Sequence, residues 1–180
     1  MASYEELFAI GERFDAFVGR GLPAEIAAVE TVRRKLAEPD TISAAVRQRL
    51  QAIQGRYHLL VVGEMWCPDC QINVTVMDYL QRTQPQIDLA IISKGRAEDD
   101  VQARLGLDRI SIPLVVVLDA NFQLVGRFIE RPQDVIAGGD AVKPDYRAGQ
   151  YLESTARDFL AIFEAAEGRA GEGIRIPDGA

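Results

Sequence analysis

Apolar residues recur at helical spacing through the first third of the chain. A first helix is indicated by apolar residues at intervals of three and four, namely Leu7, Ile10, Phe14 and Phe17. Pro23 suits the first turn of a second helix that continues to about residue 36. A third helix can be capped by Thr41 or Ser43, and its inward-facing residues are Ile42, Val46, Leu50 and Ile53. We therefore expect residues 1–55 to be helical.

The pattern changes at residue 57, where short apolar runs replace the helical spacing. Residues 57–62 and 87–92 are the β-rich runs expected of strands that are buried on both faces. The helical stretch between them turns three apolar residues inward: Val74, Met77 and Leu80. A strand–helix–strand unit of this kind places its two strands parallel in one sheet.

The second half of the chain predicts two more helices and a hairpin. A short helix is expected over residues 98–105, because its first three residues are acidic and suit the positive end of a helix dipole. Residues 114–118 and 123–129 flank a polar turn and predict an antiparallel hairpin. A final helix over about residues 150–166 has an apolar stripe made by Leu152, Phe159, Leu160 and Phe163.

Together these elements predict an α/β fold with a central mixed four-stranded sheet flanked by helices. In this interpretation residues 56–167 form the α/β domain, and residues 1–55 are a helical extension packed on it. The Gly-rich residues 168–180 are expected to form an irregular tail.

Composition and charge narrow the possible partners and compartments. The chain has 48% hydrophobic residues, a net charge of −7 and no visible basic stripe, which argues against nucleic acid and anionic membrane surfaces as partners. Its N-terminus lacks the basic start and apolar run of a secretory signal, and no apolar run is long enough to span a bilayer. We therefore expect a cytoplasmic protein without nucleic-acid or membrane partners.

The candidate chemistry lies in the only two cysteines, Cys67 and Cys70, which directly follow the first predicted strand. Disulfide exchange needs a thiolate that attacks and a second thiol that releases the mixed disulfide. At a helix start, unpaired N–H groups and the helix dipole favour a thiolate at Cys67, and Pro68 costs no hydrogen bond at the first helical position. Cys67 is thus the expected nucleophile and Cys70 the resolving thiol, forming a redox-active disulfide that needs no bound cofactor.

The cysteine motif could also bind a metal, and Asp69 within it affects the acidity of the first thiol. A C-x-x-C motif can be half of a zinc site, but the chain has no second cysteine pair and its single histidine, His58, precedes the motif, so no metal site is predicted. Asp69 lies beside the nascent thiolate, and its charge opposes ionisation of Cys67. The Cys67 thiol is therefore expected to be less acidic than in a motif with a neutral spacer residue, and the pair is expected to reduce substrates rather than oxidise them.

Two motifs in this region carry a family resemblance: Trp66-Cys67-Pro68-Asp69-Cys70 and, about forty residues later, Ser111-Ile112-Pro113. They resemble the active site and cis-proline loop of the thioredoxin superfamily over about residues 57–131. The resemblance implies a cis bond at Pro113, which packs against the cysteines, and implies that Ile112 offers backbone groups to the substrate. A wider similarity is to bacterial thioredoxin-like proteins with a helical N-terminal extension, carried by Glu64-Met65-Trp66-Cys67 and Glu130-Arg131-Pro132.

One position departs from that family pattern. Thioredoxins hold a buried acid six residues before the first cysteine, and this chain has Val61 there. Glu64 is the nearest carboxylate, so either it accepts the proton of Cys70, or turnover is slow; a plain loop role is equally open. Trp66 is either a substrate contact or a packing residue. Arg131 is expected to be a solvated arginine, with contact to an anionic substrate as the alternative.

The sequence thus predicts a thiol–disulfide oxidoreductase, specifically a specialised disulfide reductase. Its expected partners are a protein or small-molecule disulfide substrate and a thiol reductase that recycles the pair. The alternative is a redox-sensing or client-binding module of the same fold that does not turn over efficiently.

Overall fold

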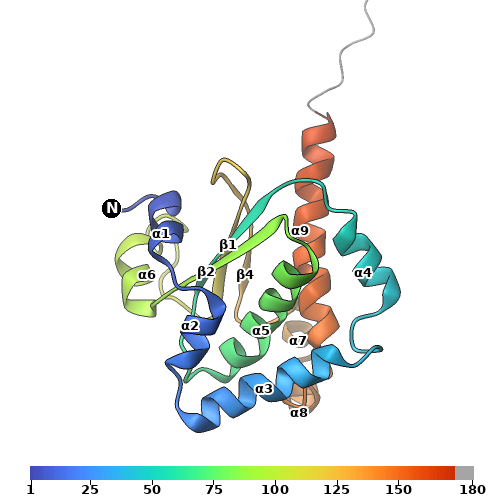
Figure 1. The fold of residues 1–180 in the computed structure, drawn as a ribbon. Coiled ribbons are helices and arrows are strands. Elements are labelled where there is room, and N and C mark those ends of the chain that lie inside the picture. The colour runs from blue at the N-terminus through green and yellow to red at the C-terminus, as the bar shows by residue number, and fades with distance from the viewer. Residues whose placement is uncertain (173–180) are drawn as a thin grey trace, which may run out of the picture.

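A four-stranded mixed sheet forms the centre of the molecule (Figure 1). The computed structural model describes residues 1–172, with side chains to residue 168. The strand order is β2-β1-β3-β4, where β1 (Tyr57–Val62) pairs parallel with β2 (Ile87–Ile92) and antiparallel with β3 (Leu114–Leu118). A hairpin joins β3 to the antiparallel edge strand β4 (Leu124–Ile129). The predicted α/β fold with a mixed four-stranded sheet is confirmed.

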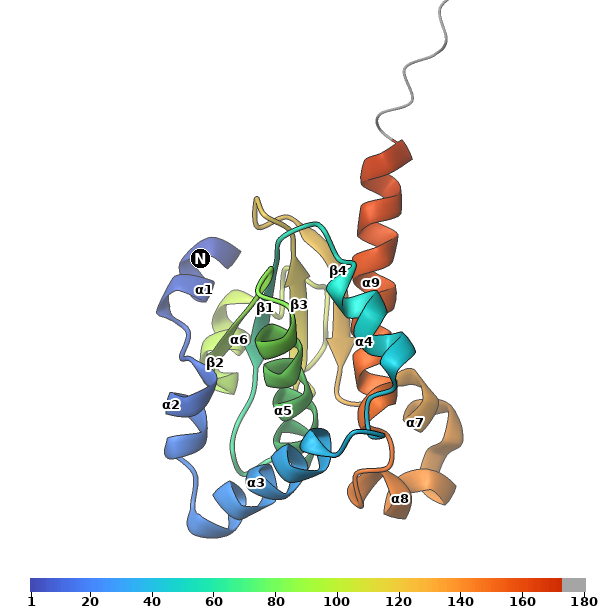
Figure 2. The same ribbon diagram turned by 45° about the vertical axis from the view of Figure 1, so that its right-hand side comes forward.

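Helices cover both faces of the sheet, as the first residues of β1 show. Tyr57 stacks on Phe163 of α9 (Leu152–Glu172) at a ring-centroid distance of 4.6 Å. The next residue, His58, contacts Phe8 of α1 (Tyr4–Ile10) at 4.9 Å. Because successive side chains of a strand point to opposite faces, α9 and α1 lie on opposite sides of the sheet. Helix α5 (Pro68–Thr83) packs against α9 on the same side (Figure 2).

The predicted first helix is two helices, α1 and α2 (Phe14–Gly19). The chain between them is drawn to the edge of β2, where Glu12 and Ile91 exchange two backbone hydrogen bonds of 2.8 and 2.9 Å. This extended residue covers the open edge of the sheet and interrupts the helix. As a result Ile10 turns outward and is 58% exposed, whereas Phe17 is buried.

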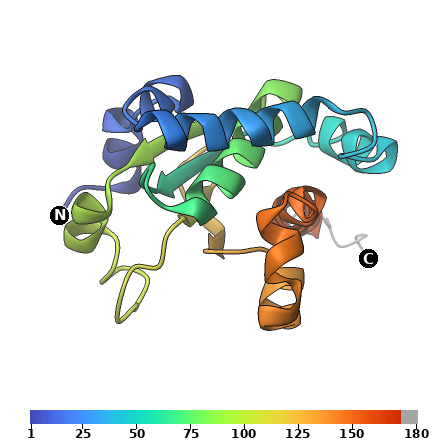
Figure 3. The same ribbon diagram turned by 90° about the horizontal axis from the view of Figure 1, so that it is seen from below.

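The second and third predicted helices are confirmed as α3 (Pro23–Ala37) and α4 (Ala44–Gln51). Of the two candidate caps, Ser43 caps α4, and its hydroxyl accepts a hydrogen bond from the Val46 N–H. The Thr41 hydroxyl instead donates to the Lys35 carbonyl at the end of α3. Helix α3 lies across α5 (Figure 3), so the N-terminal extension packs directly on the helix that carries the cysteines.

Helix α6 (Lys94–Asp100) begins four residues before the predicted start at Glu98. Its first turn is fixed earlier because the Ser93 hydroxyl accepts the Arg96 N–H and the Glu64 carboxylate accepts the Lys94 N–H. The acidic residues expected at a helix start therefore lie at the end of α6, and residues 101–106 form turns.

The chain between β4 and α9 forms three short elements that the sequence did not predict. They are α7 (Gln133–Gly138), the 3₁₀ helix η1 (Gly139–Val142) and α8 (Lys143–Arg147). Helix α9 continues to Glu172, so the predicted irregular tail is wrong for residues 168–172, and the remainder of that tail lies outside the described residues. No helix within residues 1–172 is long and apolar enough to cross a membrane.

Candidate active site

The two cysteines lie where β1 passes into α5. Cys67 has extended backbone angles (φ −87°, ψ 116°) and is the N-cap of α5, with Pro68 in the first turn. The Cys67 sulfur accepts the backbone N–H of Cys70 at 3.3 Å. The helix start therefore directs an otherwise unpaired N–H at the sulfur, in the manner of any N-cap acceptor.

The two thiols have very different environments. Both are free, and Cys67 is 5% exposed while Cys70 has no exposed surface. Hydrogen bonding by the Cys70 thiol, together with the backbone N–H groups of Cys70 and Asp69, lowers the pKa of Cys67 to about 7, against the opposing effects of burial and of the Asp69 charge. Burial and the neighbouring Cys67 raise the pKa of Cys70. Above the pKa of Cys67 the arrangement gives one thiolate and one protonated thiol.

A second loop approaches the cysteines from the start of β3. The peptide bond between Ile112 and Pro113 is cis, as the family resemblance implied. The Cys67 thiol donates to the Ile112 carbonyl at 3.6 Å, and the Ile112 side chain is buried. The structure thus brings together Cys67, Ile112 and Pro113, which are 45 and 46 positions apart in the sequence.

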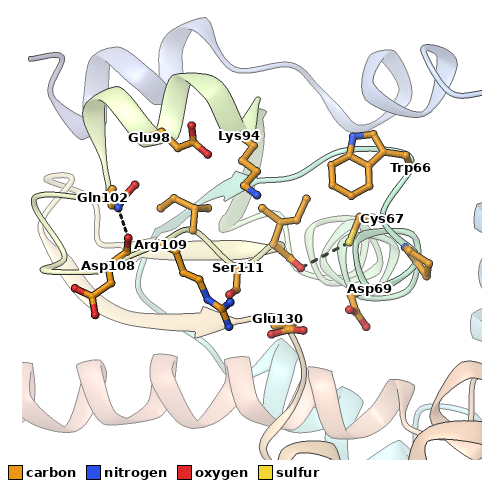
Figure 4. A pocket seen from close by; sticks show the side chains of 13 residues that line it. Trp66, Cys67, Asp69, Lys94, Glu98, Gln102, Asp108, Arg109, Ser111 and Glu130 are labelled. Atoms are coloured by element: carbon orange, nitrogen blue, oxygen red, sulfur yellow. Dashed lines mark hydrogen bonds between the residues drawn. The ribbon is translucent and has the colours of Figure 1, made fainter.

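An open groove of about 610 Å³ runs from Cys67 toward α6 and the loop before Pro113 (Figure 4). Its charged lining residues are Asp69, Lys94, Glu98, Asp108, Arg109 and Glu130. Trp66 borders the groove beside Cys67 and is 61% exposed, so its side chain is not a packing residue. The groove therefore provides a route to the Cys67 sulfur that is lined by positively and negatively charged side chains and by the Trp66 ring.

Asp69 is held by three residues of the segment that follows β4. Its carboxylate accepts a 2.7 Å hydrogen bond from the Tyr146 hydroxyl and a 3.2 Å hydrogen bond from Arg131 Nε, and Arg147 Nη2 lies 3.8 Å away. The prediction of a solvated Arg131 is therefore wrong, since the carboxylate of Asp69 binds its guanidinium. These partners lie 62 to 78 positions from Asp69, so no local motif indicated them.

The hydroxyl of Tyr146 is fixed by a buried polar network. Asn73 of α5 donates to the Tyr146 oxygen at 2.9 Å and to the Glu130 carbonyl at 3.1 Å. The Thr155 hydroxyl of α9 donates to the Asn73 side-chain oxygen at 2.7 Å. Asn73, Tyr146 and Thr155 have at most 1% of their surface exposed. Buried polar groups that satisfy one another in this way are rigid, and they anchor α8 to both α5 and α9.

Glu64 is directed at α6. Its carboxylate accepts the Lys94 N–H at 2.9 Å and so helps to cap that helix. Val61 is fully buried at the position of the family acid. Transfer of the Cys70 proton to Glu64 stays a prediction.

Among residues 1–172, no group of three or more His, Cys, Asp or Glu side chains is arranged to hold a metal ion.

The effect of Asp69 on Cys67 can be tested by thiol titration. We expect reduced wild-type protein to react with iodoacetamide at Cys67 with a pH midpoint of about 7. Asp69→Asn removes a negative charge that disfavours the thiolate, so the midpoint should fall, on the order of half a pH unit. Alkylation rates between pH 5 and 9, with the modified cysteine identified by mass spectrometry, measure the change. An unchanged or higher midpoint contradicts the assigned effect of Asp69.

Comparisons with known proteins extend these observations. A family model described as thioredoxin matches residues 11–143. One similar structure is the crystal structure of a Pseudomonas aeruginosa protein of unknown function, whose sequence is 59% identical to this chain. The two superimpose with a TM-score of 0.90, and the match covers 92% of this chain and 99% of the Pseudomonas chain. The crystal structure of an HIV epitope scaffold is 57% identical, with a TM-score of 0.89, and covers 91% of this chain and 99% of the scaffold. No curated protein matches the chain.

Proposed function

The chain belongs to the thioredoxin superfamily, and we propose that it is a thiol–disulfide oxidoreductase that acts as a specialised disulfide reductase. One observation carries this proposal: the Cys67 sulfur, at the start of α5, accepts the Cys70 N–H at 3.3 Å and opens onto the groove, while Cys70 is buried behind it. A low-pKa thiol that borders a groove, backed by a protonated thiol, is the pair that disulfide reduction requires.

The reaction follows from the different states of the two thiols. The Cys67 thiolate attacks one sulfur of a substrate disulfide, the substrate S–S bond breaks, and one substrate thiolate leaves. Cys70 then loses its proton and attacks the Cys67 sulfur, which releases the second substrate thiolate and forms the Cys67–Cys70 disulfide. The substrate gains two electrons and the protein loses two, and these are restored by an external dithiol or a thiol reductase.

The proposal names the partners by chemistry. The substrate is a protein or small-molecule disulfide that enters the groove beside Trp66, and Ile112 offers backbone groups to it. No bound cofactor is needed, because the cysteine pair carries the electrons. A reducing compartment such as the cytoplasm suits a chain whose only two cysteines form this pair.

A turnover assay tests the proposal. Wild-type protein at catalytic concentration should accelerate the reduction of insulin disulfides by dithiothreitol at pH 7, and Cys67→Ser should abolish the acceleration because a serine hydroxyl does not attack disulfides. Circular dichroism of the variant checks that the fold is retained. Equal activity of the two proteins, or stoichiometric zinc in the purified protein, contradicts the proposal.

One observation favours the alternative, a redox-sensing or client-binding module with slow turnover. Val61 is fully buried in place of the family acid, and the Glu64 carboxylate accepts a hydrogen bond from α6, so neither of these two positions offers Cys70 an unengaged carboxylate. In the assay, a sensor would form the Cys67–Cys70 disulfide stoichiometrically with an oxidant but would not accelerate insulin reduction.

A further inference from the structure

Asp69 has two opposite effects on the Cys67 thiolate. Its backbone N–H, together with that of Cys70, stabilises the negative sulfur, whereas its carboxylate charge destabilises it. The two groups belong to one residue in the first turn of α5, so the distance of the carboxylate from the sulfur depends on the side-chain conformation alone. A device that fixes this conformation controls the acidity of the attacking thiol.

The structure contains such a device, which we call the Asp69 clamp, defined as Arg131, Tyr146 and Arg147. In Figure 4 the Asp69 side chain points away from the Cys67 sulfur. On that far side it meets the Tyr146 hydroxyl at 2.7 Å and two guanidinium groups at 3.2 and 3.8 Å. Both guanidinium groups also lie over the Tyr146 ring, at 5.9 and 5.7 Å from its centre, so the three clamp residues form one packed unit.

We propose that the Asp69 clamp positions the Asp69 carboxylate away from Cys67 and balances its charge, and that the segment after β4 thereby sets the acidity of the attacking thiol. The clamp residues are positioning residues, since they act through Asp69. The inference rests on the proposed function only in taking Cys67 as the attacking thiol. It gives a role to α8, which carries Tyr146 and Arg147 and lies outside the cysteine motif.

The anchoring of the clamp supports a positioning role. Tyr146 is 1% exposed, Asn73 of α5 donates to its hydroxyl oxygen, and Thr155 of α9 donates to the side-chain oxygen of Asn73. Asp69 is itself buried, with its side chain 9% exposed, and an unpaired carboxylate there would be strongly unfavourable. The other charged residues that line the groove are not clamp members: Lys94, Glu98, Asp108, Arg109 and Glu130.

Thiol titration of reduced protein tests the proposal. In Arg131→Gln the carboxylate loses its closest cation and is freer to approach the sulfur, so the pH midpoint for alkylation of Cys67 should rise, on the order of half a unit to one unit. Arg147→Gln should give a smaller rise, because Arg147 lies farther from the carboxylate. Arg131→Lys, which keeps the charge, should restore part of the wild-type midpoint.

Repeating Arg131→Gln in an Asp69→Asn protein shows whether Arg131 acts by holding the Asp69 carboxylate or by the direct effect of its own charge on Cys67. With Asp69→Asn there is no negative charge to hold, so adding Arg131→Gln should move the midpoint by less than half of its effect in wild type. Arg127→Gln serves as a charge-matched control, since Arg127 is an exposed arginine of β4 that is no part of the clamp, and it should leave the midpoint unchanged. An unchanged midpoint in Arg131→Gln overturns the proposal, as does an equal rise in both backgrounds.

These outcomes are independent of the reductase assay. Alkylation of reduced protein needs no substrate disulfide and no turnover, so the clamp can fail while insulin is still reduced. Conversely, a protein that never turns over can still show the predicted midpoints. Arg131 is partly exposed, with 27% of its side chain accessible, and its replacement is expected to leave the fold intact; a denaturant melt of each variant verifies this.

Discussion

Replacing Cys70 by serine is expected to stop the catalytic cycle at its covalent intermediate. Cys67 keeps its place at the N-cap of α5 and still accepts the backbone N–H of residue 70, so attack on a substrate disulfide persists. Release requires a second thiol, and a serine hydroxyl cannot supply one. We expect steady-state insulin reduction to fall at least about 100-fold, since loss of an essential reacting group costs several powers of ten.

The decisive measurement is the detection of the covalent intermediate on Cys67. Incubation of reduced Cys70→Ser with a large molar excess of a small disulfide should give a mixed disulfide on Cys67, approaching one per chain, visible by intact mass. The hydrogen bond from the Cys70 thiol is the largest cause of the low pKa of Cys67, and a serine hydroxyl at position 70 can donate in its place. The trap is run at about pH 8.5, the pKa of a free thiol, so that Cys67 reacts as a thiolate.

A variant that lacks both cysteines controls for binding that does not involve a disulfide bond. The double variant with serine at both positions 67 and 70 should form no adduct at all, because the chain has no other cysteine. Adducts in that protein would show non-covalent retention. Undiminished turnover in Cys70→Ser would contradict a dithiol mechanism and point to a single-cysteine reaction that an external thiol completes.

The sheet and the place of the cysteine pair at the start of a helix could be predicted because their signals are local. Residues 57–62 and 87–92 are apolar runs interrupted by one polar residue each, His58 and Asp88, and they form β1 and β2 with those bounds. The cysteine pair follows β1 directly, so the strand–helix junction and the N-cap role of Cys67 follow from one short stretch of sequence. A buried strand and a helix start need no distant partner to be recognised.

The clamp around Asp69 could not be predicted, because it is a tertiary arrangement. Arg131 lies two residues after the end of β4, and Tyr146 lies in α8, a five-residue helix with one buried side chain and no apolar periodicity. Both residues acquire their role only when this segment folds back on α5. The sequence predicts a destabilising charge at Asp69 near the thiolate, but the partners that hold this charge lie 62 and 77 positions away.

The break between α1 and α2 has the same kind of cause. Leu7, Ile10, Phe14 and Phe17 have the spacing of one helical face. However, the backbone of Glu12 is engaged by Ile91 at the edge of β2, and this tertiary pairing overrides the local helical preference. Gly11 permits the close approach, since a Cβ atom there would lie 2.8 Å from the Cβ of Ala90.

Two apolar residues of the extension should consequently differ sharply in their effect on stability. Phe17→Ala removes a ring that is 1% exposed within the core and should lower the free energy of unfolding by about 3–5 kcal/mol. Ile10→Ala removes a side chain that is 58% exposed, and should change it by no more than about 0.5 kcal/mol. Urea unfolding with an unchanged slope measures both values.

The same melts show whether the extension and the cysteine site form one cooperative unit. Trp66 is the only tryptophan and lies beside Cys67, so its fluorescence reports on the site, while far-ultraviolet circular dichroism reports on all helices. Because α2 packs on β2 and α3 packs on α5, both signals should shift together in Phe17→Ala. If the dichroism transition moves while the Trp66 transition stays at its wild-type midpoint, the extension is a separate unit and does not stabilise the site.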